Sequence, residues 1–174
     1  MNLVTISGPP SSGKTSVILK TIGALQKRGL SVGVVKFDCL YTDDDILYKK
    51  AGIPVKKGLS GSLCPDHYFV SNIEEVVKWG IKENLDLLIT ESAGLCNRCS
   101  PYIKDIKAIC VIDNLSAINT PKKIGPMLKS ADIVVITKGD IVSQAEREVF
   151  SSRVNSVNPK AVTMHINGLT GQGA

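Results

Sequence analysis

Short apolar runs rich in valine and isoleucine recur along the chain, and most of them do not alternate apolar with polar residues. Runs of this kind are typical of parallel strands that helices cover on both faces. The pattern predicts these strands: Leu3–Ser7, Ser31–Lys36, Leu85–Thr90, Ile106–Asp113, Ile133–Thr137 and Val162–Ile166.

Helix-like stretches lie between these runs. Ser71–Glu74 and Ser143–Glu146 each have the form of a capping box, in which a serine and a glutamate three residues later satisfy free N–H groups at a helix start. Proline is favoured in a first helical turn. The predicted helices are Lys14–Arg28, Ser71 to about Asn84, a short helix after Pro121, and Ser143 to about Asn155.

The predicted elements follow one another in the order β-α-β-α-β-β-α-β-α-β. This order indicates an α/β fold, with a doubly wound, mostly parallel sheet and helices on both faces. A chain of 174 residues is large enough for one such sheet, so we expect a single domain over residues 1–174. The stretch from Phe37 to about Val70 is expected to be irregular.

Composition excludes several classes of protein. Apolar residues make up 43% of the chain and charged residues 21%, unlike a disordered or collagen-like protein. No apolar run approaches the roughly 20 residues that span a bilayer, and MNLVTISG lacks the form of a signal peptide. We therefore expect a cytoplasmic protein without membrane insertion. The net charge of +5 comes from scattered basic residues, which argues against a nucleic-acid partner.

The segment Gly8–Thr15 matches the phosphate-binding pattern G-x-x-x-x-G-K-[ST], directly after a predicted strand and at the start of a predicted helix. Its glycines let backbone N–H groups converge on phosphate oxygens. Lys14 is expected to reach the β- and γ-phosphates, and Thr15 to offer a hydroxyl to Mg²⁺. The predicted nucleotide contacts in this P-loop are Gly8, Pro9, Pro10, Ser11, Ser12, Gly13, Lys14, Thr15 and Ser16.

Acidic residues at the carboxyl ends of neighbouring strands should meet at the P-loop, where ligands bind in doubly wound sheets. Glu91 ends one strand and Asp38 follows another, so both are candidates for holding Mg²⁺ or positioning water. The alternative is that Glu91 is an acidic loop residue with no role in the site. Gly94 is expected to place its N–H near the γ-phosphate. Asp86 begins its strand, far from the P-loop, and is expected to be structural. Asp43–Asp45 is expected to be the solvent-exposed start of a helix.

A predicted strand is followed by Thr137-Lys138-Gly139-Asp140. The Asp140 carboxylate can accept hydrogen bonds from the ring N–H and the amine of guanine, whereas adenine presents the opposite pattern. The aliphatic stem of Lys138 can cover the base. This favours GTP over ATP. The further predicted base contacts are Thr137, Asn167, Gly168 and Leu169.

The five cysteines of a cytoplasmic chain are not expected to form structural disulfides. Cys64, His67, Cys96 and Cys99 offer three thiolates and an imidazole, a set suited to tetrahedral Zn²⁺ or to a thiolate-rich Ni²⁺ site. Cys96 follows Glu91 by five residues, so nucleotide state and metal occupancy can be coupled through one loop. The alternatives are unrelated loop cysteines or a redox Cys-x-x-Cys pair.

Together these segments resemble the CobW/HypB/UreG family of P-loop GTPases. Phe37–Asp45 is similar to the family's switch segment, Gly61–His67 to its Cys-His or Cys-Pro-His metal motif, and Thr137–Asp140 to its guanine motif. Asp86–Gly94 followed by two cysteines resembles the hydrogenase branch. This chain departs from the family pattern in three ways. Two residues separate Cys64 from His67, which is wider than in the family motif, and Cys99 is an extra cysteine. Thr137 stands where the family more often has asparagine.

The resemblance implies slow GTP hydrolysis, homodimers formed across the nucleotide or metal face, and metal transfer to a client metalloenzyme or accessory maturation protein. We therefore expect a metallochaperone that uses GTP and Mg²⁺ and delivers nickel, or zinc or cobalt, with Lys14, Asp38 and Glu91 serving hydrolysis. The competing hypotheses are a kinase-like transferase that uses ATP, an adapter similar to that of molybdenum-cofactor guanylylation, and a redox sensor built on Cys96 and Cys99.

Overall fold

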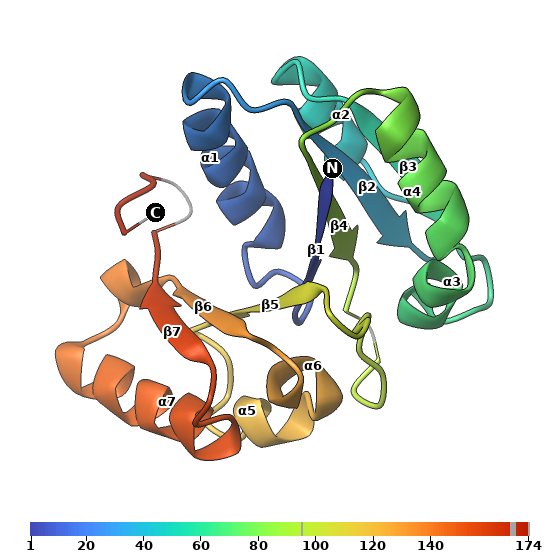
Figure 1. Cartoon of the computed structure of the whole chain (residues 1–174). Coiled ribbons are helices and arrows are strands. Elements are labelled where there is room, and N and C mark those ends of the chain that lie inside the picture. Colours follow the sequence, from blue (N-terminus) through green and yellow to red (C-terminus); the bar gives the residue numbers. More distant parts are fainter. Residues whose placement is uncertain (95, 168–169, 174) are drawn as a thin grey trace.

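A computed structural model of the chain describes residues 1–94, 96–167 and 170–173. Its centre is a seven-stranded parallel sheet in the order β3-β2-β4-β1-β5-β6-β7 (Figure 1). The strands are β1 (Asn2–Ser7), β2 (Val32–Asp38), β3 (Val55–Leu59), β4 (Leu87–Ser92), β5 (Lys107–Asp113), β6 (Ile133–Thr137) and β7 (Val162–His165).

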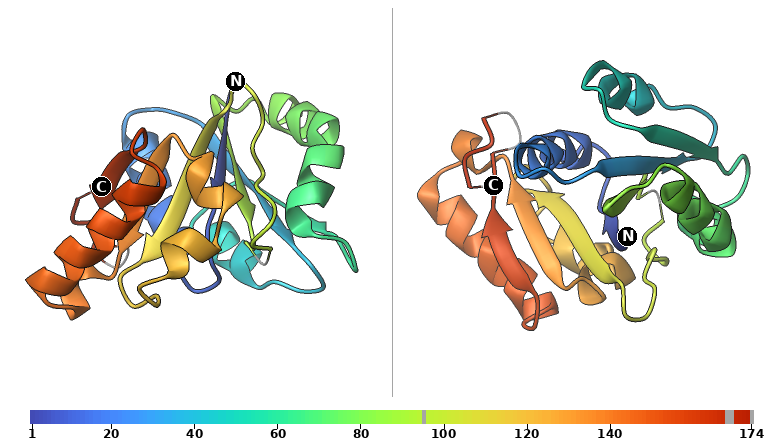
Figure 2. Two further views of the ribbon diagram at one scale, coloured as in Figure 1. Left: turned by 90° about the horizontal axis from the view of Figure 1, so that it is seen from below. Right: turned by 45° about the horizontal axis from the view of Figure 1, so that its top comes forward.

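Helices cover both faces of this sheet, which confirms the predicted doubly wound α/β class (Figure 2). They are α1 (Lys14–Lys27), α2 (Asp44–Lys50), α3 (Pro65–Ser71), α4 (Ile73–Lys82), α5 (Thr120–Lys123), α6 (Pro126–Lys129) and α7 (Gln144–Val157), with a 3₁₀ turn, η1, at Gly139–Ile141.

The two faces have separate cores. On one face α1 and α2 pack on alternate strand residues, with Ile18 and Tyr48 fully buried against Val34 and Ile89. On the other face α3 and α4 pack against β2 and β4, and α5 to α7 pack against β5 and β6. Because the central strands β2, β4, β5 and β6 are covered on both sides, their apolar residues run without alternation, as the sequence indicated.

The expectation of an irregular stretch between Phe37 and Val70 is wrong, because α2, β3 and most of α3 lie there. β3 is an edge strand with the sequence VKKGL, and its residues are half-buried or exposed. Its two lysines hide the apolar pattern from which the other strands were predicted. The two helices are seven residues each, too short to show a clear helical period.

One of the two predicted capping boxes is wrong. Ser71 is the last residue of α3, so it cannot cap the next helix, and α4 begins at Ile73 without a side-chain cap. The second capping box is confirmed: the Glu146 N–H donates to Ser143 Oγ, and the Ser143 N–H donates to Glu146 Oε2. Local sequence specifies a helix start only where the chain before it is not already helical.

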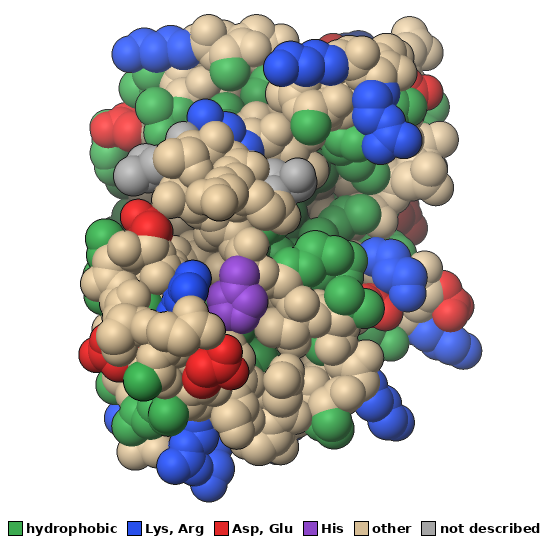
Figure 3. Space-filling view, turned by 90° about the vertical axis from the view of Figure 1, so that its left-hand side faces the viewer, with side chains coloured by type: hydrophobic (Ala, Val, Ile, Leu, Met, Phe, Trp, Pro, Cys, Tyr) green, Lys and Arg blue, Asp and Glu red, His purple; other side chains and the backbone are tan. Residues whose placement is uncertain are grey.

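All seven strands point the same way, so their carboxyl ends share one edge of the sheet. On the face around the C-terminal segment, charged side chains of both signs are interspersed (Figure 3). Over the described residues, each helix is too short or too polar to cross a bilayer.

Candidate nucleotide and metal site

The P-loop joins β1 to α1 as the sequence predicts. Gly8 has a φ of +147°, and a Cβ there would lie 1.9 Å from the Val111 carbonyl oxygen. Gly13 has a φ of +90° at the first turn of α1. At Gly8 only glycine combines the backbone angle with so close an approach to β5, and at Gly13 the left-handed angle itself favours glycine. The loop is therefore shaped by its two glycines.

Lys14 is buried, and its ammonium bends back over the loop. Nζ donates to the Gly8 carbonyl at 2.9 Å and to the Pro9 carbonyl at 2.8 Å. Burial lowers the pKa of Lys14 to about 8, although the nearby charge of Glu91 opposes this shift. The Ser12 hydroxyl is buried without a hydrogen-bond partner among the described residues. An orphaned donor beside a buried cation fits a loop that binds phosphate.

A cavity of about 440 Å³ opens beside this loop. Two lysines and three acids face it together, an unusual density of charge for one pocket. Asp38 at the end of β2 lines it, as predicted, and its Oδ1 accepts from the Cys39 N–H at 2.8 Å. The lining residues are Pro10, Ser11, Gly13, Lys14, Thr15, Ser16, Lys36, Asp38, Asp44, Leu47, Glu91 and Ala93.

Glu91 is fully buried at the end of β4 and is held by three donors. Its Oε1 accepts from the Thr15 hydroxyl at 2.8 Å and from Lys36 Nζ at 3.0 Å, and its Oε2 accepts from the Tyr48 hydroxyl at 2.7 Å. Burial and the charge of Glu91 raise the pKa of Tyr48, so the phenol remains a donor. Glu91 is therefore not a plain loop acid, because its hydrogen bonds connect β4 to the P-loop, β2 and α2.

Lys36 and Tyr48 were missed by sequence reasoning. Lys36 interrupts the apolar run of β2, and that interruption was the one signal that could have found it. Although burial opposes the shift, Glu91 and Asp44 together raise the pKa of Lys36, which keeps it charged. Tyr48 left no signal, because a tyrosine in a short helix is usually a core residue.

The expectation that Asp43–Asp45 forms a solvated helix start is wrong in part. The helix does begin there, but Asp44 pairs with Lys36 at 2.6 Å and lines the cavity. Asp45 is buried and pairs with Lys49 and Lys57, both at 2.8 Å. Asp44 and Asp45 serve tertiary contacts because α2 packs its first turn against β2 and β3, whereas Asp43 is exposed as expected.

Gly94 lies against the start of the P-loop. It has a φ of +66°, and a Cβ at this position would lie 1.8 Å from the Gly8 carbonyl oxygen. The segment after β4 therefore touches the phosphate-binding loop directly, and only a glycine permits the contact. Asp86, at the other end of β4, accepts from the Ser31 N–H at 2.8 Å, a structural contact as expected.

The predicted guanine motif borders a second cavity of about 250 Å³ on the other side of the P-loop. Thr137 donates its hydroxyl to the Ser12 carbonyl and Lys138 donates to the Ser11 carbonyl, each at 2.7 Å. The lining residues are Gly13, Ser16, Thr137, Lys138, Asp140, Ile141 and Asn167. The predicted contacts Gly168 and Leu169 lie outside the described residues.

Replacing Asp140 by alanine is expected to lower the preference for GTP over ATP by about tenfold or more, because the donors of guanine lose their acceptor. Asp140→Asn should bind xanthosine triphosphate better than wild type does, since xanthine carries a carbonyl where guanine has its amine. Competition titrations with the three nucleotides measure both effects. An unchanged preference in Asp140→Ala would remove Asp140 from the base site.

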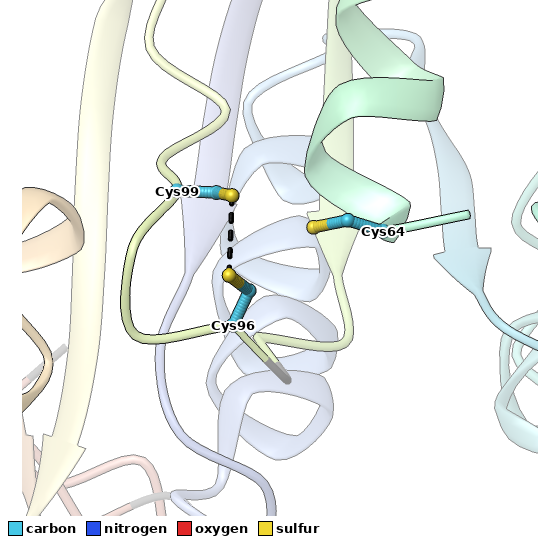
Figure 4. Close-up of side chains that lie close together, drawn as sticks. All are labelled: Cys64, Cys96 and Cys99. Atoms are coloured by element: carbon cyan, nitrogen blue, oxygen red, sulfur yellow. Dashed lines mark hydrogen bonds between the residues drawn. The ribbon is translucent and has the colours of Figure 1, made fainter. Parts of the chain in front are cut away.

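Three cysteines converge between α3 and the loop after β4 (Figure 4). Cys64 precedes the first residue of α3, and Cys96 and Cys99 come from the loop. The Cys96 and Cys99 sulfurs are 3.1 Å apart, and all three sulfurs lie within 4.8 Å of one another. Sulfurs bound at about 2.3 Å to a tetrahedral ion stand about 3.8 Å apart, so the cluster has the size of a thiolate metal site.

His67 occupies the edge of this cluster. It is exposed, and its Nε2 lies 3.7 Å from Cys99 Sγ. It is not one of the groups that approach all three thiols within 4.8 Å. The structure therefore brings the three predicted cysteines together and leaves His67 beside one of them. Cys110 is fully buried in the core, and Cys39 lies outside the group.

The thiols have unequal acidities. The hydrogen bond from the Cys99 thiol lowers the pKa of Cys96, whereas burial raises the pKa of Cys99 to about 12. Of these two thiols, Cys96 is therefore the more acidic. All three are free thiols in this structure. Such a cluster binds a soft or borderline cation with loss of thiol protons.

A buried acid lies next to the cluster. Asp66, in the first turn of α3, is 1% exposed, and its Oδ1 accepts from the hydroxyl of Ser92. Burial raises the pKa of Asp66, partly offset by that hydrogen bond and by the charges of His67 and Lys14. Its second oxygen has no hydrogen-bond partner among the described residues.

Comparison with known proteins agrees with this geometry. The model of the CobW/HypB/UreG nucleotide-binding domain matches residues 2–165. The chain is 57% identical to the uncharacterized protein MJ0120 of Methanocaldococcus jannaschii, over 99% of this chain and 74% of that protein. It is 31% identical to the urease accessory protein UreG of Yersinia enterocolitica, over 98% of this chain and 83% of that protein.

Solved structures share the fold. The hydrogenase maturation factor HypB of Archaeoglobus fulgidus superposes with a TM-score of 0.76 at 20% identity, over 99% of this chain and 84% of that one. HypB from Helicobacter pylori in complex with nickel gives the same TM-score and identity, over 99% of this chain and 81% of that one.

Proposed function

Because the chain belongs to the CobW/HypB/UreG family of P-loop GTPases, we propose that it is a GTP-hydrolysing metallochaperone that binds nickel and delivers it to a client metalloenzyme. The observation that carries this proposal is the meeting of Cys64, Cys96 and Cys99 beside the end of β4, whose Glu91 lines the P-loop cavity. Zinc is the alternative cargo, since three thiolates suit both ions.

In this proposal the P-loop and Lys14 bind the phosphates, and Asp140 reads the base. Thr15 and Asp38 would hold Mg²⁺, which would neutralise charge on the β- and γ-phosphates. The Thr15 hydroxyl donates its proton to Glu91, so its oxygen lone pairs remain available to a cation. Glu91 therefore orients Thr15 and belongs to the magnesium site through it. The γ-phosphate would draw Lys14 away from the two carbonyls that it now contacts.

We also propose how the chain associates with itself and with its partners. Residues 1–174 act as a single domain, two copies associate in a nucleotide- or metal-dependent way, and an accessory maturation protein or the client receives the ion. Free thiols in the cluster suit a reducing cytoplasm. The UreG and HypB relatives support the assignment to nickel-enzyme maturation.

The test is to purify the chain without oxygen, load it with Ni²⁺ or Zn²⁺, and titrate GTP and ATP with and without the metal. We expect stoichiometric metal, preference for GTP, and measurable GTP turnover. Lys14→Ala should weaken GTP binding by about tenfold or more and leave metal loading unchanged, since both of its hydrogen bonds go to P-loop carbonyls and neither goes to the thiol cluster. A chain that binds no metal but forms a reversible Cys96–Cys99 disulfide would support the redox hypothesis instead.

A further inference from the structure

Two consecutive residues at the end of β4 contact different sites on opposite faces of the sheet. Glu91 faces α1 and α2, where it accepts from Thr15 and Tyr48. Ser92 faces the other side and donates to Asp66 of α3. This division follows from the strand, because successive side chains point to opposite faces. A shift of the Glu91 backbone therefore moves Ser92 as well.

In the sequence, Asp66 lies between Cys64, which belongs to the thiol cluster, and His67, which lies at its edge. Its carboxyl is 1% exposed, and one of its oxygens lacks a partner within the described part of the chain. Burial of a polar group with so few hydrogen bonds costs free energy. The Ser92 hydroxyl is thus the contact that fixes this carboxyl, and with it the first turn of α3.

The position of that turn sets the position of a thiol. Cys64 lies at the start of α3 in extended conformation, and the Tyr68 N–H donates to its carbonyl at 2.9 Å, so Cys64 moves with the helix. Cys96 and Cys99 belong to a different segment, the loop after β4. A displacement of α3 relative to β4 changes the distance from Cys64 to the other two sulfurs, on which coordination depends.

We propose that the Ser92–Asp66 hydrogen bond carries the coupling between the two sites, with Asp66 as a positioning residue for the thiol cluster. Nucleotide that engages Thr15 and Glu91 on one face of β4 thereby changes metal affinity on the other. This inference rests on the proposed function, because it requires that the chain bind both nucleotide and metal.

The experiment measures the dissociation constant of Zn²⁺, by competition with a chromogenic chelator, without nucleotide and with a non-hydrolysable GTP analogue and Mg²⁺. The ratio of the two constants is the coupling. It is compared in the wild type, Ser92→Ala, Asp66→Ala, the double variant, and Ser71→Ala, which alters an exposed serine at the end of α3. Thermal unfolding of each variant establishes that it is folded.

We expect a wild-type ratio at least about fivefold away from one, the lower range of allosteric coupling. Ser71→Ala should keep this ratio. Ser92→Ala and Asp66→Ala should bring it to within about twofold of one while each still binds Zn²⁺, and the double variant should lose no more than either single change. A purely structural role would lower stability or the affinity for Zn²⁺ and leave the ratio between the two nucleotide conditions unchanged.

Two results would overturn the proposal in distinguishable ways. If the wild type is coupled and both single variants keep its ratio, the coupling runs through the loop that carries Cys96 and Cys99, and this inference alone is wrong. If the wild type binds metal and nucleotide with a ratio of one, the inference and nucleotide gating are both wrong. If the wild type fails to bind Zn²⁺ or fails to bind the GTP analogue, the proposed function is wrong, and the inference falls with it.

Discussion

Replacement of Cys64, Cys96 or Cys99 by alanine is expected to lower the affinity for Ni²⁺ and Zn²⁺ by about 100-fold or more. Loss of a residue that only supports a ligand costs 10- to 100-fold, so loss of a thiolate ligand lies at or beyond the top of that range. The three sulfurs lie within 4.8 Å of one another, so we expect all three to bind the same ion.

The measurement is metal competition at constant pH, together with the sulfur-to-metal charge-transfer absorption of the nickel form. Cys39→Ala is the matched control, because Cys39 is also half-buried but lies outside the cluster. The affinity of the wild type should rise with pH between about 6 and 8, since metal binding displaces thiol protons. A Cys64→Ala or Cys99→Ala variant with wild-type affinity would show that the cluster is not the metal site.

His67→Ala belongs to the same series with a smaller effect. Of the three cysteines, the imidazole contacts Cys99, on the exposed edge of the cluster. If His67 supplies the fourth ligand, His67→Ala should lower metal affinity by an intermediate amount. If water or a second copy of the chain supplies it, the affinity should not change. The absorption band separates the two outcomes, because it reports the donors around the ion.

Replacement of Glu91 by alanine is expected to destabilise the protein by about 3–5 kcal/mol, the cost of breaking a buried ion pair on one side. Lys36 would lose one of its two carboxylate partners, and the hydroxyls of Thr15 and Tyr48 would lose their acceptor. GTP turnover of the folded fraction should fall by about 100-fold, because Thr15 would no longer be oriented. Urea unfolding and GTPase assays measure the two effects.

Two further variants separate stability from activity at this site. Tyr48→Phe removes one hydrogen bond to a charged group and should cost about 1.5–3 kcal/mol while turnover persists. Glu83→Ala, at an exposed glutamate after α4, should change stability by less than about 0.5 kcal/mol. Wild-type turnover in a folded Glu91→Gln variant would exclude Glu91 from hydrolysis, whatever its effect on unfolding.

The sequence by itself determined the features that depend on neighbouring residues. The P-loop, the six predicted strands and the Ser143 capping box are local patterns, and the structure reproduces all of them with ends shifted by one or two residues. Parallel strands also place their carboxyl ends together, so the sequence alone assigns Asp38 and Glu91 to one edge of the sheet.

Only the tertiary structure decided which side chains meet. Lys36 and Tyr48 contact Glu91 because β2 and α2 pack against the end of β4. The interruption of β2 by Lys36 marks an unusual position, but nothing in either segment identifies Glu91 as the partner. In the same way α3 brings Cys64 to Cys96 and Cys99, and Asp66 to Ser92, across 26 residues or more. Contacts at this separation depend on how helices are placed on a sheet, which is fixed by burial of the whole core rather than by local sequence.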